Sequence, residues 1–571
     1  MDNFIKYLNS MNSAKIGSMN ALAESQVISE YYSRIFVKRN IAEKIYNLLT
    51  EKNEAIILTG HAGDGKTSIL IQVLDRLGYF THGKKPLREE ELFENLYYVK
   101  DMSELNPALQ KKLLLKLLNA PHEAKSSIIV SNTGPLINTF NDLFEESTES
   151  ESLEKRILQG IGDVISEPIQ FVLDGKAYRF RLVNIANIDN SYLVREILRK
   201  LTDQSLWGEC KECKNAFKCP IYNNYLDVIA NIEGLNEQIT LLYYWLSEKG
   251  TRLTIRQLVA HITYSLTSNL DCEEVDGFSG VPDNLFKYSF ANSFFGFRGL
   301  ESYEDAKNIK TVNELRNVSL DEKTLGKIDI QLFVKEDLSK FSENIQMVLL
   351  DMINKNPDAI GDFDSDATRR ALRRYFILFN NETIEKRKAL NEVLISEAIV
   401  GYYHAATKTI LDIQYKRKIE KTIFTALFRL FLGVFPKKNE ESLYITLRKD
   451  FHLIQNTQML IGKIPKSDLK INLKPRKNLI EPELIKSELF LEFGNSEFRI
   501  SAEFLDFLFK FSEGEVFTDL NPSFTFGLSR LKSNLLKEYK FKDESINLMI
   551  VQKNMLHKIK VKVEDSKIYV D

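Results

Sequence analysis

The sequence predicts a multidomain protein with an α/β domain built around a parallel β-sheet, then helical regions, and a β-rich C-terminal domain. Between residues 51 and 205, strand-like apolar stretches alternate with amphipathic helical stretches, which favours a parallel sheet covered by helices. Apolar residues spaced three and four apart then dominate as far as Pro436. Beyond Pro436, short stretches such as 443–447 and 489–493 indicate β-strands.

The length and the composition narrow the class of protein. A chain of 571 residues suggests about three to four domains. Charged residues make up 27% and the net charge is −2, so a DNA contact would need a local basic patch. The N-terminus lacks the features of a signal peptide. The most apolar run, 422–433, contains Arg429 and is too short to span a bilayer. We therefore expect a cytoplasmic protein without a membrane partner.

The expected domains follow in chain order. They are an N-terminal helical segment at 1–50, the α/β core at 51–205, a helical lid at 206–330, a helical domain at 331–436 and the β-rich domain at 437–571, with one helix at 502–511. Within the core, the expected strands cover 55–59, 95–101, 127–134 and 178–187, and an amphipathic helix covers 109–118.

The first strand of the core leads into a glycine-rich loop with the spacing G-x-x-x-x-G-K-T, and a helix follows. Glycines let the backbone N–H groups turn inward, and these groups attract a polyphosphate together with the helix N-terminus. Lys66 would reach the β- and γ-phosphates, and Thr67 would place its hydroxyl on Mg²⁺. The sequence predicts ATP as the ligand of a P-loop NTPase. The residues expected to hold it are Gly60, His61, Ala62, Gly63, Asp64, Gly65, Lys66, Thr67 and Ser68.

An acidic residue at the end of the next strand is expected to take part in hydrolysis. Asp101 would hold Mg²⁺ together with Thr67, as an Asp on a neighbouring strand does in P-loop enzymes. Met102 occupies the position where a catalytic Glu is expected, so Glu104 is our candidate for the general base. The alternative is that Asp101 and Glu104 cap the following helix, and hydrolysis would then be slow or gated.

Two further polar residues complete the predicted catalytic set of Lys66, Asp101, Glu104, Asn132 and Arg256. Asn132 ends a strand, where it could hydrogen-bond the attacking water or the γ-phosphate. Its alternative role is in the turn before Gly134 and Pro135. Arg256, which we prefer to Arg252, lies at the start of a helix in the lid. The alternative interpretation is that Arg256 is an ordinary surface residue. Three candidates for an arginine finger stay open: Arg156, Arg195 and Arg199.

Four cysteines suggest a structural zinc site. Cys210 and Cys213 have the C-x₂-C spacing, and Cys219 and Cys272 complete a set of four. Disulfides are rare in a reducing cytosol. The alternative is a group of ordinary buried thiols.

Four arginines at 369–374 could contact DNA. Arg369 and Arg373, and likewise Arg370 and Arg374, are four residues apart on an expected helix, so their guanidinium groups could grip phosphates. The alternative is internal neutralisation by the upstream acids Asp362, Asp364 and Asp366.

Several motifs recur together between about residues 30 and 275. They are Gly60–Thr67, Val99–Asp101, Asn132–Gly134, Asn184–Asp189, Trp207 ahead of the three clustered cysteines and Pro220, and Thr254–Leu258 ahead of Cys272. The combination resembles the DptF-like ATPases of bacterial DNA-phosphorothioation-dependent restriction systems, within the AAA+ class of P-loop NTPases. The resemblance implies a role in anti-phage defence, DptG-like and DptH-like partner subunits, and action on DNA. The resemblance does not decide whether the chain forms an oligomer.

Two other functions stay open. One is a nucleotide-gated scaffold with little hydrolysis, and the other is a sensor ATPase of another phage-defence system. The sequence contains no convincing set of nuclease residues, so we expect any DNA cleavage to be carried out by a partner.

Overall fold

The structure is a computed structural model that describes residues 2–12, 29–80, 87–144, 150–173, 175–278, 281–355, 365–448, 455–477, 479–517, 520–542, 545–552, 555–564 and 567–570. The chain forms two compact units. Unit 1 comprises Met1–Thr383 together with Ile480–Glu483, and unit 2 comprises Ile384–Leu479 together with Leu484–Asp571. Each unit is described by itself below.

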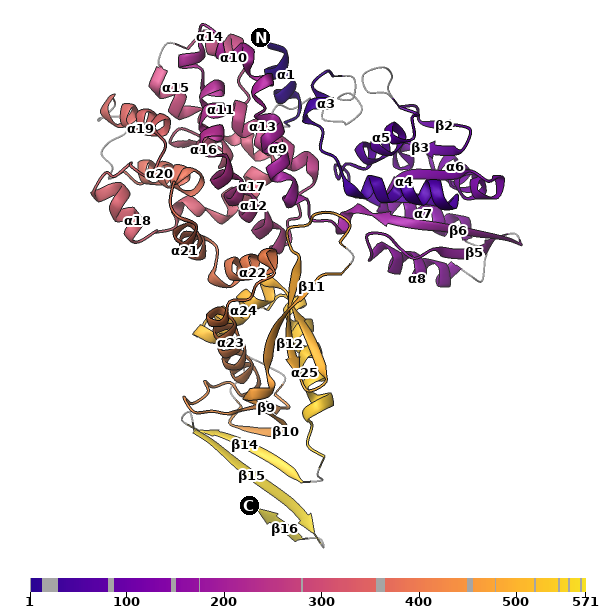
Figure 1. Ribbon diagram of the computed structural model, residues 1–571. Coiled ribbons are helices and arrows are strands. Elements are labelled where there is room, and N and C mark those ends of the chain that lie inside the picture. Colours follow the sequence, from indigo (N-terminus) through magenta and orange to yellow (C-terminus); the bar gives the residue numbers. More distant parts are fainter. Residues whose placement is uncertain are drawn as a thin grey trace. The chain divides into compact units, whose positions relative to one another are not determined.

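A six-stranded sheet organises the first part of unit 1 (Figure 1). Its strands are β1 (Ala55–Gly60), β2 (Glu90–Leu92), β3 (Leu96–Val99), β4 (Ser126–Asn132), β5 (Ile169–Leu173) and β6 (Lys176–Asn184), in the order β2-β3-β4-β1-β6-β5. The central strands β3, β4, β1 and β6 run parallel, and the two edge strands pair antiparallel. The predicted α/β class with a parallel sheet is therefore confirmed.

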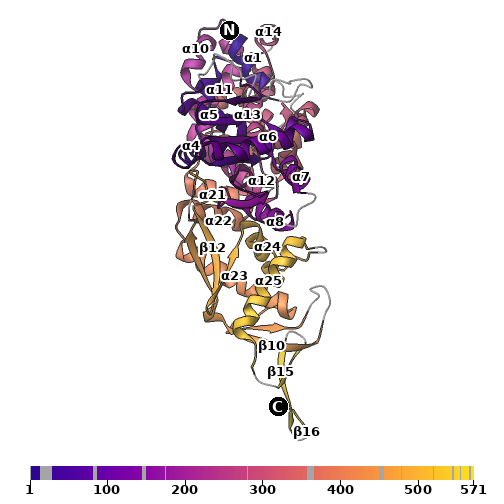
Figure 2. The same cartoon turned by 90° about the vertical axis from the view of Figure 1, so that its right-hand side faces the viewer.

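Helices cover both faces of this sheet. The two on one face are α4 (Asn40–Lys52) and α5 (Lys66–Arg76), and the three on the other are α6 (Pro107–Asn119), α7 (Thr133–Phe144) and α8 (Ser150–Ile161). Figure 2 shows α4 and α7 on opposite sides. Successive side chains of a strand point to opposite faces. In β1, Ile56 and Leu58 accordingly pack with α4 and α5, whereas Ala55 and Ile57 pack with the other helices.

The rest of unit 1 is mainly helical. Its helices are α1 (Asp2–Ser10), α3 (Tyr32–Ile35), α9 (Val194–Leu201), α10 (Gly208–Lys211), α11 (Pro220–Ala230), α12 (Ile232–Glu248), α13 (Ile255–Thr267), α14 (Cys272–Asp276), α15 (Val281–Lys287), α16 (Phe290–Phe294), α17 (Lys310–Val318), α18 (Lys327–Asp329), α19 (Glu343–Lys355) and α20 (Asp366–Phe379), with a short hairpin of β7 (Phe297–Arg298) and β8 (Glu301–Ser302). Helix α13 lies at the centre, in contact with α1, α9, α11, α16 and α17. It starts with a capping box, in which Thr254 and Gln257 bond each other's backbone N–H groups.

Unit 2 combines helices and antiparallel strands. Its helices are α21 (Ile384–Leu394), α22 (Glu397–Lys408), α23 (Ile413–Leu432), α24 (Ala502–Glu513) and α25 (Pro522–Tyr539). One sheet has the order β16-β15-β14-β10-β9 and contains β9 (Ser442–Thr446), β10 (Thr457–Pro465), β14 (Ile546–Gln552), β15 (Met555–Glu564) and β16 (Lys567–Val570). The other contains β11 (Lys470–Pro475), β12 (Ser487–Phe493) and β13 (Ser496–Ile500).

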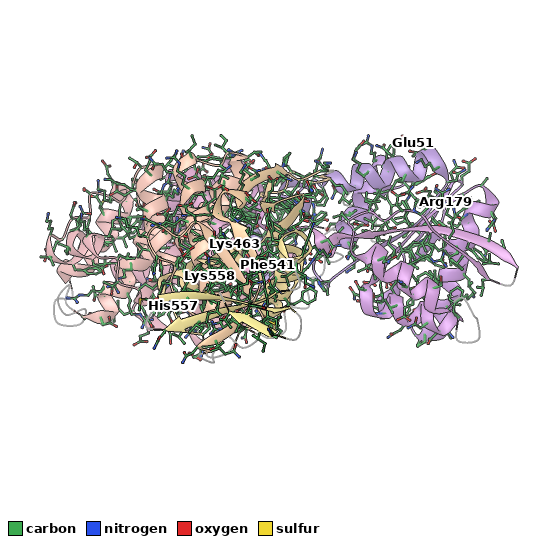
Figure 3. The ribbon with its side chains drawn as sticks, turned by 90° about the horizontal axis from the view of Figure 1, so that it is seen from below. Glu51, Arg179, Lys463, Phe541, His557 and Lys558 are labelled. Atoms are coloured by element: carbon green, nitrogen blue, oxygen red, sulfur yellow. The ribbon has the colours of Figure 1, made fainter. Side chains whose placement is uncertain are left out.

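In unit 2, a helix that precedes Pro436 packs against a strand and a helix that follow it. Helix α23 packs against β9 and α24, so the long helix shares a unit with the strands that follow it. On β15, Lys558 donates a hydrogen bond to the hydroxyl of Tyr444 on β9 over 2.6 Å (Lys558 is labelled in Figure 3).

Among the described residues, none of the helices combines the length and the apolar character needed to cross a bilayer.

Candidate functional site

The glycine-rich loop joins the end of β1 to the start of α5. Gly60, Gly63 and Gly65 have φ angles of 154°, 87° and 87°, which L side chains rarely adopt. Gly65 is the N-cap of α5 and brings no side-chain hydrogen bond to the first turn. The loop therefore turns sharply into α5, which begins at Lys66. The N-cap residue supplies no side chain to the positive end of the helix dipole.

Lys66 is buried at the base of the loop. Its Nζ donates to the carbonyl oxygens of Gly60 at 3.2 Å and His61 at 2.9 Å, and to Oδ1 of Asn132 at 2.7 Å. Burial lowers the pKa of Lys66, while the nearby carboxylates of Asp101 and Asp64 act in the opposite direction. The ammonium group thus joins the loop to the end of β4, which pairs with β1.

A buried ion pair fixes the shape of the loop. Asp64, fully buried, accepts hydrogen bonds from the backbone N–H of His61 at 2.9 Å and from Nη1 of Arg252 at 2.8 Å. Arg252 also donates to the carbonyl oxygens of Ile185 and Ile188, after β6. Arg252, to which Arg256 is preferred on the sequence alone, thus has its partner 188 residues away, and no local pattern indicates this pair.

Arg256 reaches the same place from the start of α13. Its backbone N–H donates to the carbonyl oxygen of Gly63 at 3.2 Å, and burial lowers the pKa of its guanidinium. A Cβ added to Gly63 would lie 3.0 Å from Oγ1 of Thr254 and 3.2 Å from Cβ of Arg256. The N-terminus of α13 therefore packs directly on the loop.

A cavity of about 310 Å³ brings the predicted catalytic residues together. Lys66, Asp101, Glu104, Asn132 and Arg256 all line it. So do Ala62, Gly63, Gly65, Thr67 and Ser68 from the loop, whereas Gly60, His61 and Asp64 do not line it. Its remaining wall is largely apolar and comes from α3, α9, α13 and the stretch before α4: Tyr32, Ile35, Phe36, Val37, Ile197, Leu201, Ile255 and Val259. No motif in the sequence marks these apolar residues individually.

The two candidate acids lie on a short 3₁₀ turn, Met102–Glu104, after β3. Asp101 caps this turn, because its Oδ1 accepts from the backbone N–H of Ser103 at 2.8 Å. The hydroxyl of Ser103 in turn accepts from the backbone N–H of Asn132 at 2.6 Å. Asp101 therefore caps this 3₁₀ turn, whereas the following helix α6 is capped by Asn106, whose side chain accepts from the backbone N–H of Leu109. Ser103, which no sequence motif marks, connects the turn to β4.

The three arginine-finger candidates have other partners and do not line this cavity. Arg156 donates to the carbonyl oxygens of Ser152 and Gln170. Arg195 and Arg199 both pair with Glu233, at 2.9 Å and 3.0 Å, and their side chains are about half exposed.

The metal predictions are wrong. Cys210, Cys213, Cys219 and Cys272 are free thiols that line a separate cavity of about 290 Å³. In the part of the chain that the structure describes, no group of three or more His, Cys, Asp or Glu side chains is arranged to hold a metal ion, which covers both the zinc site and the Mg²⁺ site expected at Thr67 and Asp101. Burial raises the pKa of Cys210 to about 12 and also raises the pKa of Cys219 and Cys272.

The arginines at 369–374 are engaged within unit 1. Arg374 is fully buried, and its Nη1 lies 2.8 Å from Oδ2 of Asp321. Arg370 pairs with Asp321 and Glu322, and Arg373 with Asp329, while Arg369 stacks over Phe333. Acids at 321–329 thus neutralise Arg370, Arg373 and Arg374. Of the upstream acids weighed as neutralising partners, Asp362 and Asp364 lie outside the described residues.

The cavity combines two chemical environments. The ammonium of Lys66 and the N-terminus of α5 favour a polyanion. The apolar part of the wall favours a flat or apolar group. Comparison of this chain with known protein families, curated proteins and solved structures found no match.

Proposed function

We propose that this chain binds ATP in the cavity at the glycine-rich loop and hydrolyses it. The observation that carries the proposal is the position of Lys66, whose buried ammonium lies between the loop carbonyls and Asn132 and lines the cavity. The oxygens of the β- and γ-phosphates would accept hydrogen bonds from this ammonium and from the backbone N–H groups at the start of α5. The apolar stretch Ile35–Val37 would lie against the nucleoside.

Hydrolysis needs a polarised water near the γ-phosphate. Glu104 and Asp101 line the cavity and are the carboxylates that could accept a proton from this water. Asn132 would orient the water or the γ-phosphate through its side-chain amide, and Arg256 would stabilise the charge that develops on the phosphate oxygens. The strand order supports this division of roles, because the ends of β1, β4 and β3 meet at one edge of the sheet.

A second candidate is a nucleotide-gated scaffold that binds ATP and hydrolyses it slowly. Asp101 favours this reading, because one of its oxygens is committed to the backbone of Ser103. Met102, beside it, is fully buried and brings no catalytic group. A turnover that rises severalfold with DNA or a partner protein would exclude the scaffold.

For the biological setting, we propose a component of a DNA-phosphorothioation-dependent restriction system in the cytoplasm, acting on DNA with DptG-like and DptH-like subunits. The support is the resemblance of the quoted motifs alone. The arginines at 369–374 are not part of the proposal, because Arg373 and Arg374 are buried and paired with acids.

The test is a calorimetric titration of the full chain with ATP, alongside Lys66→Ala and Lys116→Ala. Lys116 is a matched control, since it is a half-exposed lysine on α6, paired with Glu90, that does not line the cavity. We expect the wild-type chain and Lys116→Ala to bind ATP alike, and Lys66→Ala to lose binding by about 100-fold or more, or about 2.7 kcal/mol. Phosphate release measured with and without DNA then separates the ATPase from the scaffold. Equal binding by all three proteins would contradict the proposed site.

A further inference from the structure

Four residues from the C-terminal half of the chain belong to unit 1. The segment Ile480–Glu483 lies in sequence between β11 and β12 of unit 2, yet it is grouped with Met1–Thr383. Glu481 and Glu483 are buried, at 3% and 6% exposure. A carboxylate this deeply buried is stable only with charge and hydrogen-bond partners.

Glu481 finds these partners at the N-terminus of α4. Its Oε1 accepts from Nε of Arg39 at 3.0 Å and from the backbone N–H of Ile41 at 3.2 Å, and its Oε2 accepts from the backbone N–H of Asn40 at 3.1 Å. The N-cap residue of α4, Arg39, supplies no capping side chain of its own. Glu481 therefore caps α4 from 440 residues away, with a negative charge at the positive end of the helix.

Arg39 connects this cap to the candidate nucleotide cavity. It is one of the residues that line the cavity, and its side chain is 98% buried. Its backbone N–H donates to Oε1 of Gln72 on α5, and its guanidinium lies 5.9 Å from the ring centre of Tyr192. Nη1 and Nη2 are buried and find no hydrogen-bond acceptor among the residues that the structure describes. Burying unpaired donors is unfavourable, so an acceptor supplied by a ligand would stabilise this arrangement.

We propose that Glu481 is a positioning residue of the ATP site, and that ATP binding and docking of the Ile480–Glu483 segment strengthen each other. This inference rests on the proposed function. Residues 35–37 and 39 form the cavity wall, and residues 39–41 hold Glu481, so one short stretch serves both. A ligand that orders this stretch favours the docked segment, and by thermodynamic reciprocity the docked segment favours the ligand. In the sequence, this segment lies between β11 and β12 of unit 2.

The affinity test uses the full chain with Glu481→Gln, Glu481→Leu and the control Glu54→Gln. Glu54 is also a buried carboxylate next to α4, paired with Arg181 at 2.6 Å and Arg179 at 3.1 Å, but it lies beyond the other end of the helix and does not line the cavity (Arg179 is labelled in Figure 3). We expect ATP to bind Glu481→Gln about tenfold more weakly than wild type. Glu481→Leu, which also loses the oxygen that caps α4, should be weaker still. Glu54→Gln should stay within about twofold.

A second measurement reports docking directly. Amide hydrogen exchange of residues 479–486, followed by mass spectrometry, should slow when ATP is added to the wild-type chain, and should not change in Lys66→Ala. A purely structural role for Glu481 would not make exchange depend on ATP. This measurement decides the question even if the Glu481 variants fail to fold.

The outcomes separate the two proposals. A wild-type chain that does not bind ATP overturns the proposed function and the coupling with it. A wild-type chain that binds ATP without slower exchange at 479–486, or with unchanged affinity in Glu481→Gln, overturns only the coupling.

Discussion

Nζ of Lys66 lies 2.7 Å from Oδ1 of Asn132, so the loop after β1 and the end of the adjacent strand β4 share one hydrogen bond. Both residues line the cavity. A phosphate oxygen is a stronger partner for an ammonium than an amide oxygen, because both members of the pair are charged. A bound triphosphate would therefore displace Oδ1 of Asn132 from Lys66, and the freed side chain could donate from its Nδ2 group to the γ-phosphate or accept from water through Oδ1.

The first prediction concerns this released amide. In Asn132→Ala, the turnover number for ATP should fall by about 100-fold, as expected for the loss of one hydrogen-bond donor that acts mainly in the transition state. The dissociation constant for ATP should change by less than about threefold, since Lys66 remains. Steady-state hydrolysis and calorimetric binding check the two values separately. Asn119→Ala is the control, because Asn119 is the last residue of α6 and does not line the cavity. Equal losses of binding and turnover in Asn132→Ala would contradict the assigned role.

The second prediction concerns the contact between the loop and α13. Gly63→Ala places a Cβ 3.0 Å from Thr254 Oγ1 on a residue with φ of +87°. Gly78 has a similar φ of +77° and open space around it, so Gly78→Ala carries the backbone strain alone. The strain should destabilise both variants by roughly 1–2 kcal/mol. Only Gly63→Ala should also bind ATP more weakly. Chemical denaturation and calorimetry measure the two effects, and matching ATP affinities in the two variants would argue against close packing of α13 on the loop.

The third prediction concerns Arg374. Its guanidinium is fully buried and donates to Asp321 at 2.8 Å, Asn292 at 3.0 Å and the carbonyl oxygen of Gly299 at 2.9 Å. Arg374→Met leaves Asp321 short of a partner, so the free energy of unfolding should drop by about 3–5 kcal/mol. Urea denaturation checks this, with the less buried Arg369→Met as the control. A loss below about 1 kcal/mol would show that the network does not stabilise unit 1.

The fourth prediction concerns pH. Burial lowers the pKa of His261 from 6.5 to about 4, and its ring nitrogens bond the hydroxyl of Tyr243 and the carbonyl oxygen of Phe294. The unfolded chain therefore takes up this proton first, and the stability due to neutral His261 is present above pH 6.5 and lost as pH falls towards 4. The advantage of wild type over His261→Gln should shrink by about 2–3 kcal/mol between pH 7 and pH 4.5. Because other groups titrate equally in both proteins, a constant difference would contradict the lowered pKa.

The fifth prediction concerns the cysteines. The purified chain should contain less than about 0.1 zinc ion per molecule, and a chelator should leave its melting temperature unchanged. At pH 8, Cys210 should react with iodoacetamide far more slowly than a free thiol, because its pKa is about 12. Elemental analysis and mass spectrometry measure both. One zinc ion per chain, with unfolding on chelation, would show that the thiols do bind metal.

The α/β core could be predicted because its signals are local. The apolar run Ala55–Leu58, typical of a strand buried on both faces, is visible in the sequence, as is the glycine-rich turn before α5. Residues at the ends of parallel strands must meet at one edge of the sheet. That rule alone brings Asp101 and Asn132 to the cavity that Lys66 lines.

Other features depend on contacts between distant residues, which no local pattern encodes. Glu481 pairs with Arg39 across 442 positions, and Asp64 with Arg252 across 188. The acids that pair with Arg370, Arg373 and Arg374 lie about 40 to 50 residues upstream, and no rule of sequence spacing predicts pairs this far apart. Helix α25 was not expected within a region of alternating stretches. The cysteine spacing failed for a different reason, since C-x₂-C fixes only one pair of the four ligands that zinc requires.

The most direct test of the ATP site is a crystal structure of the chain with a slowly hydrolysed ATP analogue. We expect the triphosphate to lie along the Gly60–Thr67 loop, with Nζ of Lys66 moved from Asn132 to the β- and γ-phosphates. The account would be contradicted if the analogue, at a saturating concentration, were absent from the loop and Lys66 were still hydrogen-bonded to Gly60, His61 and Asn132.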